Sequence, residues 1–153
     1  MMVRSAGFKA RTKLACEIAN LDPQQLNEVI SFKHFNCAPK TKAGSARVFQ
    51  RDDIVVLIVL SLLLKAPLKQ SQAGFIACEI KDVLKSDHGS KLEWITFFQD
   101  MAGFSVCLAG QMNPDEKPAA FGPIFFELSF PVGAFRRDVE EKLAEHATIL
   151  GSE

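Results

Sequence analysis

The sequence predicts an α+β fold, with a mainly helical N-terminal half and a smaller mixed region after it. Apolar residues recur at helical spacing through most of residues 1–86, whereas helical and strand-like segments are mixed after residue 87. A length of 153 residues fits one ordinary domain or two small ones sharing a core, and a hydrophobic fraction of 48% can fill that core. We therefore expect two regions, residues 1–86 and residues 87–153.

The first two helices are predicted from an apolar stripe and a start signal. Apolar residues recur at helical spacing from Arg11 to Leu21. Asp22 then stands at an N-cap, with Pro23 at the first helical position, where proline loses no hydrogen bond. A second helix continues through Leu26, Val29 and Ile30. Two short helices that meet at a tight turn are a helix-turn-helix candidate.

A basic hairpin is expected next. Phe35, Val48 and Phe49 suit short strands, and the run of residues 40–44, Lys-Thr-Lys-Ala-Gly, is typical of a hairpin tip.

Two further helices follow the hairpin. Asp52 or Asp53 is expected to cap a third helix, Ile54–Leu64, which is apolar on every side. Such a helix must be covered all round, so the C-terminal half, a partner subunit or both must pack on it. A fourth helix is expected over Ser71–Lys85.

The C-terminal half mixes helix and strand. Ser90 and Glu93 form a capping-box pattern that favours a helix over Lys91–Met101, although the segment from Glu93 to Phe98 is also strand-like. Strands are expected over Phe104–Ala109 and Ile124–Phe130, separated by a loop at residues 113–118. A final helix is expected over Phe135–Ala147.

Charge is divided between the two halves. Residues 1–86 hold 13 Lys and Arg against 7 Asp and Glu, an excess of six positive charges. Residues 87–153 hold 5 against 11, an excess of six negative charges. This division of charge indicates that the basic half binds a polyanion and that the acidic half has a different role.

The four cysteines, Cys16, Cys37, Cys78 and Cys107, are widely spread and have no metal-finger spacing. We expect free thiols in a reducing cytoplasm, with no metal and no cofactor. The longest apolar run, Ile54 to Leu64, is shorter than the roughly 20 residues that a membrane-spanning helix needs, and residues 1–7 lack the apolar stretch of a signal peptide. The sequence therefore predicts a cytoplasmic protein without a membrane partner.

The order helix, turn, helix, basic hairpin, buried helix and helix describes a winged helix-turn-helix. Over roughly residues 11–86 the chain resembles the DNA-binding domain of MerR-type regulators and the related phage excisionases. Arg47, Phe49, Asp53 and Ile54 stand where that family has Arg, an aromatic residue, a helix cap and an aliphatic residue, with Gly44 nearby in the wing. Matching positions follow at Leu57, Leu60, Leu63, Pro67 and Leu68. The resemblance implies the docking mode only, because the turn has Asp22-Pro23 in place of Gly and the family's long C-terminal coiled-coil helix is absent.

The candidate DNA-binding residues divide into base readers and phosphate contacts. Gln24, Gln25 and Asn27 lie on the exposed side of the second helix, and amide side chains can pair with adenine in the major groove. Basic residues that could flank this side and neutralise phosphates are Arg11, Lys13, Lys33, Lys40, Lys42 and Arg47. Two alternatives stay open: a merely solvated helix surface for the amides, and pairing of Arg47 with Asp52 or Asp53.

No catalytic constellation is recognised. His34 lies near Cys37 but has no oriented partner, so a satisfied or exposed histidine is the simpler interpretation, and phosphate-binding glycine loops are missing. We expect a non-enzymatic regulator of transcription, a repressor or phage-type regulator, that binds double-stranded DNA as a homodimer. Its Phe-rich C-terminal half (Phe121, Phe125, Phe126 and Phe130) would pair the subunits or receive a ligand or a protein partner. The alternatives are a protein-interaction module on the same scaffold and an excisionase-like factor that bends DNA.

Overall fold

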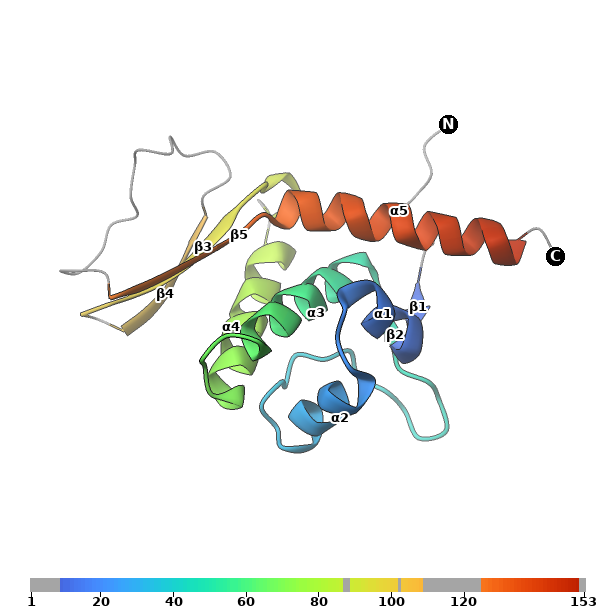
Figure 1. Cartoon of the computed structure of the whole chain (residues 1–153), viewed down its shortest axis with the longest axis horizontal. Helices are drawn as coiled ribbons and strands as arrows, with labels where there is room; N and C mark the ends of the chain where they lie inside the picture. Colours follow the sequence, from blue (N-terminus) through green and yellow to red (C-terminus); the bar gives the residue numbers. More distant parts are fainter. Residues whose placement is uncertain (1–8, 87–88, 102, 109–124, 152–153) are drawn as a thin grey trace.

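Five α-helices, a 3₁₀ turn and two small antiparallel sheets make up the part of the chain that the computed structural model describes. That part is residues 9–86, 89–101, 103–108 and 125–151, with backbone alone at residues 90, 100, 104–108 and 148–151. The mixture of helix and strand confirms the α+β prediction. Figure 1 shows the N-terminal helices beneath the long C-terminal helix, with the larger sheet to one side.

The first two helices, α1 (Thr12–Ala19) and α2 (Pro23–Ser31), meet at a tight turn. Asn20 makes this turn in the left-handed conformation, with φ 56°, which asparagine tolerates better than most residues. Asp22 accepts a hydrogen bond from the amide of Gln24 at 2.9 Å, so the predicted N-cap is confirmed. The hydroxyl of Ser61 donates to the carbonyl of Asn20 at 2.8 Å and fixes the turn against the core.

The prediction of a hairpin between α2 and the third helix is wrong, because the segment around Phe35 does not pair with Val48 and Phe49. β2 (Val48–Phe49) pairs with β1 (Ala10–Arg11), a strand that precedes α1, and Phe49 lies opposite Ala10. Phe35 is only 2% exposed and packs in the core. Its segment forms no strand. The chain between α2 and β2 is therefore a long loop, here called the wing loop (residues 32–47).

The third helix, α3 (Arg51–Leu64), begins earlier than predicted. Its N-cap is Gln50, whose amide donates to the carboxylate of Asp53 at 3.0 Å. The two aspartates expected at the cap, Asp52 and Asp53, thus lie in the first turn, where negative charge also favours the helix dipole. The prediction of a helix covered on every side is confirmed for most of its length, although Leu62 is 46% exposed. The buried residues are Ile54, Val55, Val56, Leu57, Val59, Leu60, Ser61 and Leu63.

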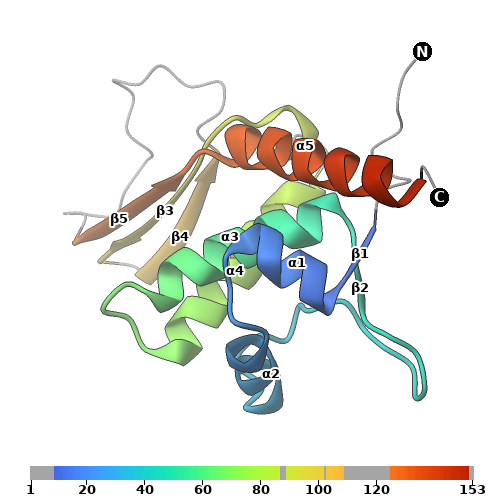
Figure 2. The same ribbon diagram turned by 45° about the vertical axis from the view of Figure 1, so that its right-hand side comes forward.

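Helices from both halves of the chain cover α3. α1 and α4 (Gln70–Lys85) pack on it from the N-terminal half, and α5 (Val132–Gly151) packs on it from the C-terminal half. Figures 1 and 2 both show α5 lying across α1 and α3. Val139 and Leu143 are buried on α5. The expected final helix is confirmed, although it is longer than predicted.

The C-terminal sheet has the order β4–β3–β5 and is antiparallel throughout. Its strands are β3 (Ile95–Asp100), β4 (Gly103–Leu108) and β5 (Phe126–Phe130). The two strands predicted at this end of the chain are thus confirmed within about two residues. The expected loop at residues 113–118, together with Phe121, lies outside the described residues.

The helix expected over Lys91–Met101 is wrong. The capping-box residues serve other purposes: a 3₁₀ turn spans Gly89–Lys91, and Glu93 pairs with Arg137 on α5 at 3.0 Å. The side chains from Ile95 to Phe98 are all buried, which suits a central strand with cover on both faces. Tertiary packing overrides the local signal here.

An ionic network joins the two halves at the start of α3. Arg136, 6% exposed on α5, donates to Asp52 at 3.1 Å and to the carbonyl of Gly89. Arg51 pairs with Asp52 and with Glu140 of α5. The hydrophobic core is likewise continuous across residue 86. Among the described helices, none combines the length and the apolar composition that crossing a bilayer requires.

Candidate nucleic-acid interface

α2 presents one polar stripe to solvent. Gln24, Asn27, Glu28 and Ser31 are exposed and follow one another at intervals of three, one and three residues, which places them on one helix face. Leu26 and Val29 are buried on the opposite face and fix the orientation of the helix. Of the three predicted base readers, Gln24 and Asn27 therefore share the stripe, whereas Gln25 is half-buried at its margin.

The wing loop ends in an ordered turn that carries two lysines. The amide of Ser45 donates to the carbonyl of Lys42 at 3.0 Å, and the hydroxyl of Thr41 donates to the carbonyl of Ser45 at 2.6 Å. Gly44 supplies the left-handed residue of the turn, with φ 81°. Lys40 and Lys42 are both exposed, as phosphate contacts must be.

Arg47 closes the wing loop instead of pairing with an aspartate. Its guanidinium donates to the carbonyl of Pro39 on the other arm of the loop. Asp52 and Asp53, the acidic partners left open by the sequence, pair with other cations. Arg47 is half-buried, so its role in this structure is to hold the two arms of the loop together.

The remaining basic candidates lie at three different places. Arg11 is exposed on β1, directly opposite Val48 at the base of the wing loop. Lys33 is exposed just after α2 and adopts a left-handed conformation, with φ 60°. Lys13 shares a face of α1 with Glu17, which lines a groove beneath α5, so it is not brought to the α2 stripe.

α2 and the wing loop lie on the same edge of the molecule. In Figures 1 and 2 both project away from α5, α2 at the bottom and the wing loop beside it. A groove of about 330 Å³ separates them and is lined by residues of both, among them Ile30, Asn36 and Thr41. A helix with exposed amides beside a lysine-tipped loop can place one element in a major groove and the other on the flanking backbone.

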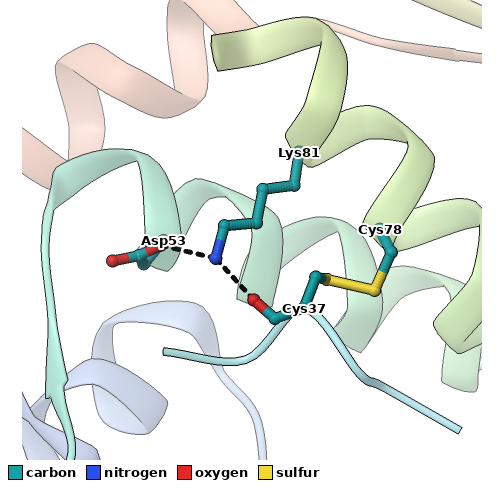
Figure 3. Close-up of a disulfide and its surroundings, with 4 residues drawn as sticks. All are labelled: Cys37, Asp53, Cys78 and Lys81. Carbon is teal, nitrogen blue, oxygen red and sulfur yellow. Dashed lines mark hydrogen bonds and ion pairs between the residues drawn. A yellow bond between two sulfur atoms is a disulfide. The ribbon is translucent and has the colours of Figure 1, made fainter. Parts of the chain in front are cut away.

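A disulfide holds the start of the wing loop against α4 (Figure 3). The Cα atoms of Cys37 and Cys78 lie 5.5 Å apart across 41 residues of sequence. The expectation of free thiols is therefore wrong for these two cysteines, because the fold brings the loop onto the helix. Lys81 reinforces the junction: its ammonium donates to the carbonyl of Cys37 and pairs with Asp53 at 3.1 Å.

The surroundings of Cys16, Arg51 and Arg137 shift the pKa values of these three side chains. Burial, with a smaller contribution from the charge of Asp22, raises the pKa of the Cys16 thiol to about 11, so this cysteine is protonated at neutral pH. Burial lowers the pKa of Arg51, but hydrogen bonds and charges from Glu140 and Asp52 outweigh it and raise the pKa above its ordinary value. The hydrogen bond to Glu93 likewise raises the pKa of Arg137.

His34 departs from the simple expectation of a satisfied or exposed side chain. Its Nδ1 atom is buried and has no hydrogen-bond partner among the residues that the structure describes. The ring lies 6.1 Å from that of Phe32, centroid to centroid. His34 is followed within three residues by Cys37, so an unsatisfied imidazole lies in the same segment as the disulfide.

Sequence reasoning missed the residues that support the interface. Cys37, Cys78 and Lys81 act through contacts between segments about 40 residues apart. Such contacts cannot be predicted from the local sequence pattern. Glu28 could have been found by extending the helical stripe from Gln24. Within the described ranges, no group of His, Cys, Asp and Glu side chains is placed to hold a metal ion.

Comparison with known proteins adds no assignment. No protein-family model matches the chain, and none of the curated proteins matches it.

Proposed function

We propose that this protein is a sequence-specific regulator that binds double-stranded DNA, with residues 11–86 acting as a MerR-like winged helix-turn-helix. α2 enters the major groove and the wing loop follows the adjacent backbone. The protein is not an enzyme: it acts by occupying or reshaping its binding site as a repressor or a phage-type regulator.

One observation carries the proposal: α2, which bears exposed amides, and the wing loop, which bears exposed lysines, lie on one edge of the molecule. Gln24 and Asn27 supply bidentate donors and acceptors for adenine, and Glu28 can accept from the amino group of cytosine. Lys40 and Lys42 supply the positive charge that neutralises phosphates and releases counterions. The arrangement thus offers base reading and backbone positioning at once.

The test is duplex binding by wild type and by the double charge reversal Lys40→Glu/Lys42→Glu. Two lost phosphate contacts should weaken binding to every duplex by about tenfold or more and reduce the slope of log affinity against log salt by about 2. Fluorescence anisotropy with random-sequence duplexes over a salt series measures both quantities. Gln24→Ala and Asn27→Ala should instead change which sequence is preferred, and selection from a random library would reveal it.

A matched control changes the same net charge elsewhere. Lys85 and Lys91 are exposed at the far end of α4 and in the 3₁₀ turn, so Lys85→Glu/Lys91→Glu should have a much smaller effect. An equal loss from both charge reversals would contradict the proposed docking edge. A wild-type protein that retains no duplex at low salt would overturn DNA binding itself.

We place this activity in the cytoplasm and assign it to a homodimer. Met101 and Phe125 are 62% and 64% exposed, and the pairing of Gln99 with Phe126 puts them at the same end of the C-terminal sheet. An apolar patch on a sheet that extends away from the helices (Figure 1) suits subunit pairing, which would set the spacing of two DNA half-sites. The mass of the protein in solution decides between monomer and dimer.

A protein-interaction module is the second candidate. Phe32 is 59% exposed directly after α2, and the stripe includes the acid Glu28, which suits a protein partner better than a phosphate backbone. The salt series separates the two functions, because a module of this kind would show no duplex binding that falls with salt.

A further inference from the structure

The disulfide between Cys37 and Cys78 lies in a groove that is lined neither by Gln24 and Asn27 nor by Lys40 and Lys42. The groove has a volume of about 420 Å³ and runs between the chain that leaves α2 and one face of α4. Cys78 comes from that face together with Gly74 and Asp82, each one helical turn away. Both cysteines line the groove and both are half-buried, so the disulfide borders a space that a small solute can enter.

The rim of the groove carries groups of opposite charge. Lys33 and Asp82 are exposed and line it, and neither forms an ion pair with another described residue. Asn36 and Ser71 add an amide and a hydroxyl, and Phe75 adds an aromatic ring. This set of groups fits a small zwitterion: a carboxylate toward the lysine and an ammonium toward the aspartate.

The groove also holds an imidazole whose hydrogen bonding is incomplete. His34 lines it, and its buried Nδ1 atom has no partner within the described part of the chain. Buried polar atoms are nearly always satisfied, so an orphaned one beside a groove indicates a ligand or a chemical role. A ring nitrogen of this kind can donate or accept a hydrogen bond.

We propose that this groove is a thiol–disulfide exchange site for a small thiol of the amino-acid or short-peptide type. The thiolate of the small molecule attacks one sulfur of the Cys37–Cys78 disulfide and forms a mixed disulfide, and the other cysteine leaves as a thiolate that takes up a proton. A second thiol attacks the mixed disulfide and releases the oxidised small molecule. Two electrons and two protons thus pass from two thiols to the protein, and the oxidised small molecule reverses the reaction.

The surroundings allow this exchange without unfolding. After the disulfide opens, Lys81 still binds the carbonyl of Cys37, and Phe35 still anchors the chain in the core. Cys16 is fully buried, and its raised pKa keeps it protonated, so it does not compete as a nucleophile. The chemistry is thereby directed to the cysteine pair in the groove.

The test compares two thiols at equal thiolate concentration: glutathione, a zwitterionic peptide thiol, and 2-mercaptoethanol, which carries no charged group besides its thiol. The rate of disulfide opening in the folded, full-length chain is followed by alkylation and mass spectrometry. The ratio of the rate with glutathione to the rate with 2-mercaptoethanol is also measured in urea, where the groove is lost. That ratio gives the intrinsic difference in reactivity between the two thiols. We expect the folded protein to favour glutathione by about tenfold over that reference, the advantage that about 1.4 kcal/mol of recognition provides.

Two exposed substitutions locate the effect. Lys33→Glu and Asp82→Lys should each remove most of the preference for glutathione, whereas Lys85→Glu, outside the groove, should leave it unchanged. Equal ratios in the folded and urea-unfolded chain would overturn the proposal, as would a preference that neither rim substitution alters. A folded disulfide that neither thiol opens would overturn it too. None of these measurements involves DNA, so the result is independent of the proposed function.

Discussion

Replacing Gly74 with alanine is expected to destabilise the protein by about 3 kcal/mol or more, because the new methyl group would collide with the backbone. A Cβ atom at this position would lie 1.7 Å from the carbonyl oxygen of His34 and 2.6 Å from its carbonyl carbon. Neither side can yield easily: Gly74 is inside α4, and His34 precedes the core residue Phe35. Urea unfolding followed by circular dichroism measures the loss.

The sign of this result makes it diagnostic. In an unobstructed helix interior, the change from glycine to alanine stabilises by about 0.5–1 kcal/mol. Ser71→Ala, an exposed substitution in the same helix, serves as the control and should change the free energy of unfolding by less than about 0.5 kcal/mol. A Gly74→Ala protein as stable as wild type would mean that the wing loop does not approach α4 this closely.

Removing the buried guanidinium of Arg136 has the second largest expected effect. Arg136→Met keeps the aliphatic part of the side chain but removes the hydrogen bonds to Asp52 and to the carbonyl of Gly89. Asp52 is one-third exposed and keeps Arg51, so the expected loss is about 2 kcal/mol, below the full penalty for a buried unpaired charge. Thermal and urea unfolding of the variant measure this loss.

The neighbouring arginine provides a matched control. Arg137 pairs with Glu93 but is 65% exposed, and water screens such a pair. Arg137→Met should therefore leave the unfolding midpoint unchanged. If the two arginine variants were equally stable, the ionic junction between α3 and α5 would not contribute to the fold.

The helices were predictable because their signals are local. The stripe of α1, the Asp22-Pro23 start of α2 and the apolar run of α3 each lie within about three helical turns. Local signals also misled: Ser90 and Glu93 predict a cap, but burial of the segment from Ile95 to Phe98 makes it the central strand of a sheet. Where a local pattern and tertiary burial conflict, burial decides.

The candidate interface was predictable only in part, for the same reason. Exposure of Gln24 and Asn27 follows from the amphipathic pattern of α2, and exposure of Lys42 follows from the turn sequence around it. The pairing of β1 with β2 could not be predicted, because each strand has two residues and 36 residues separate them. The disulfide between Cys37 and Cys78 depends on a contact of similarly long range.

The position of α5 across α3 has a consequence for how the chain can be divided. α3 is apolar on every side, and α5 supplies the cover for one of them. A fragment that ends at residue 86 would expose that side to water, and such a surface drives self-association. The segment up to residue 86 is therefore not a self-sufficient unit, and the whole chain should melt in a single cooperative transition.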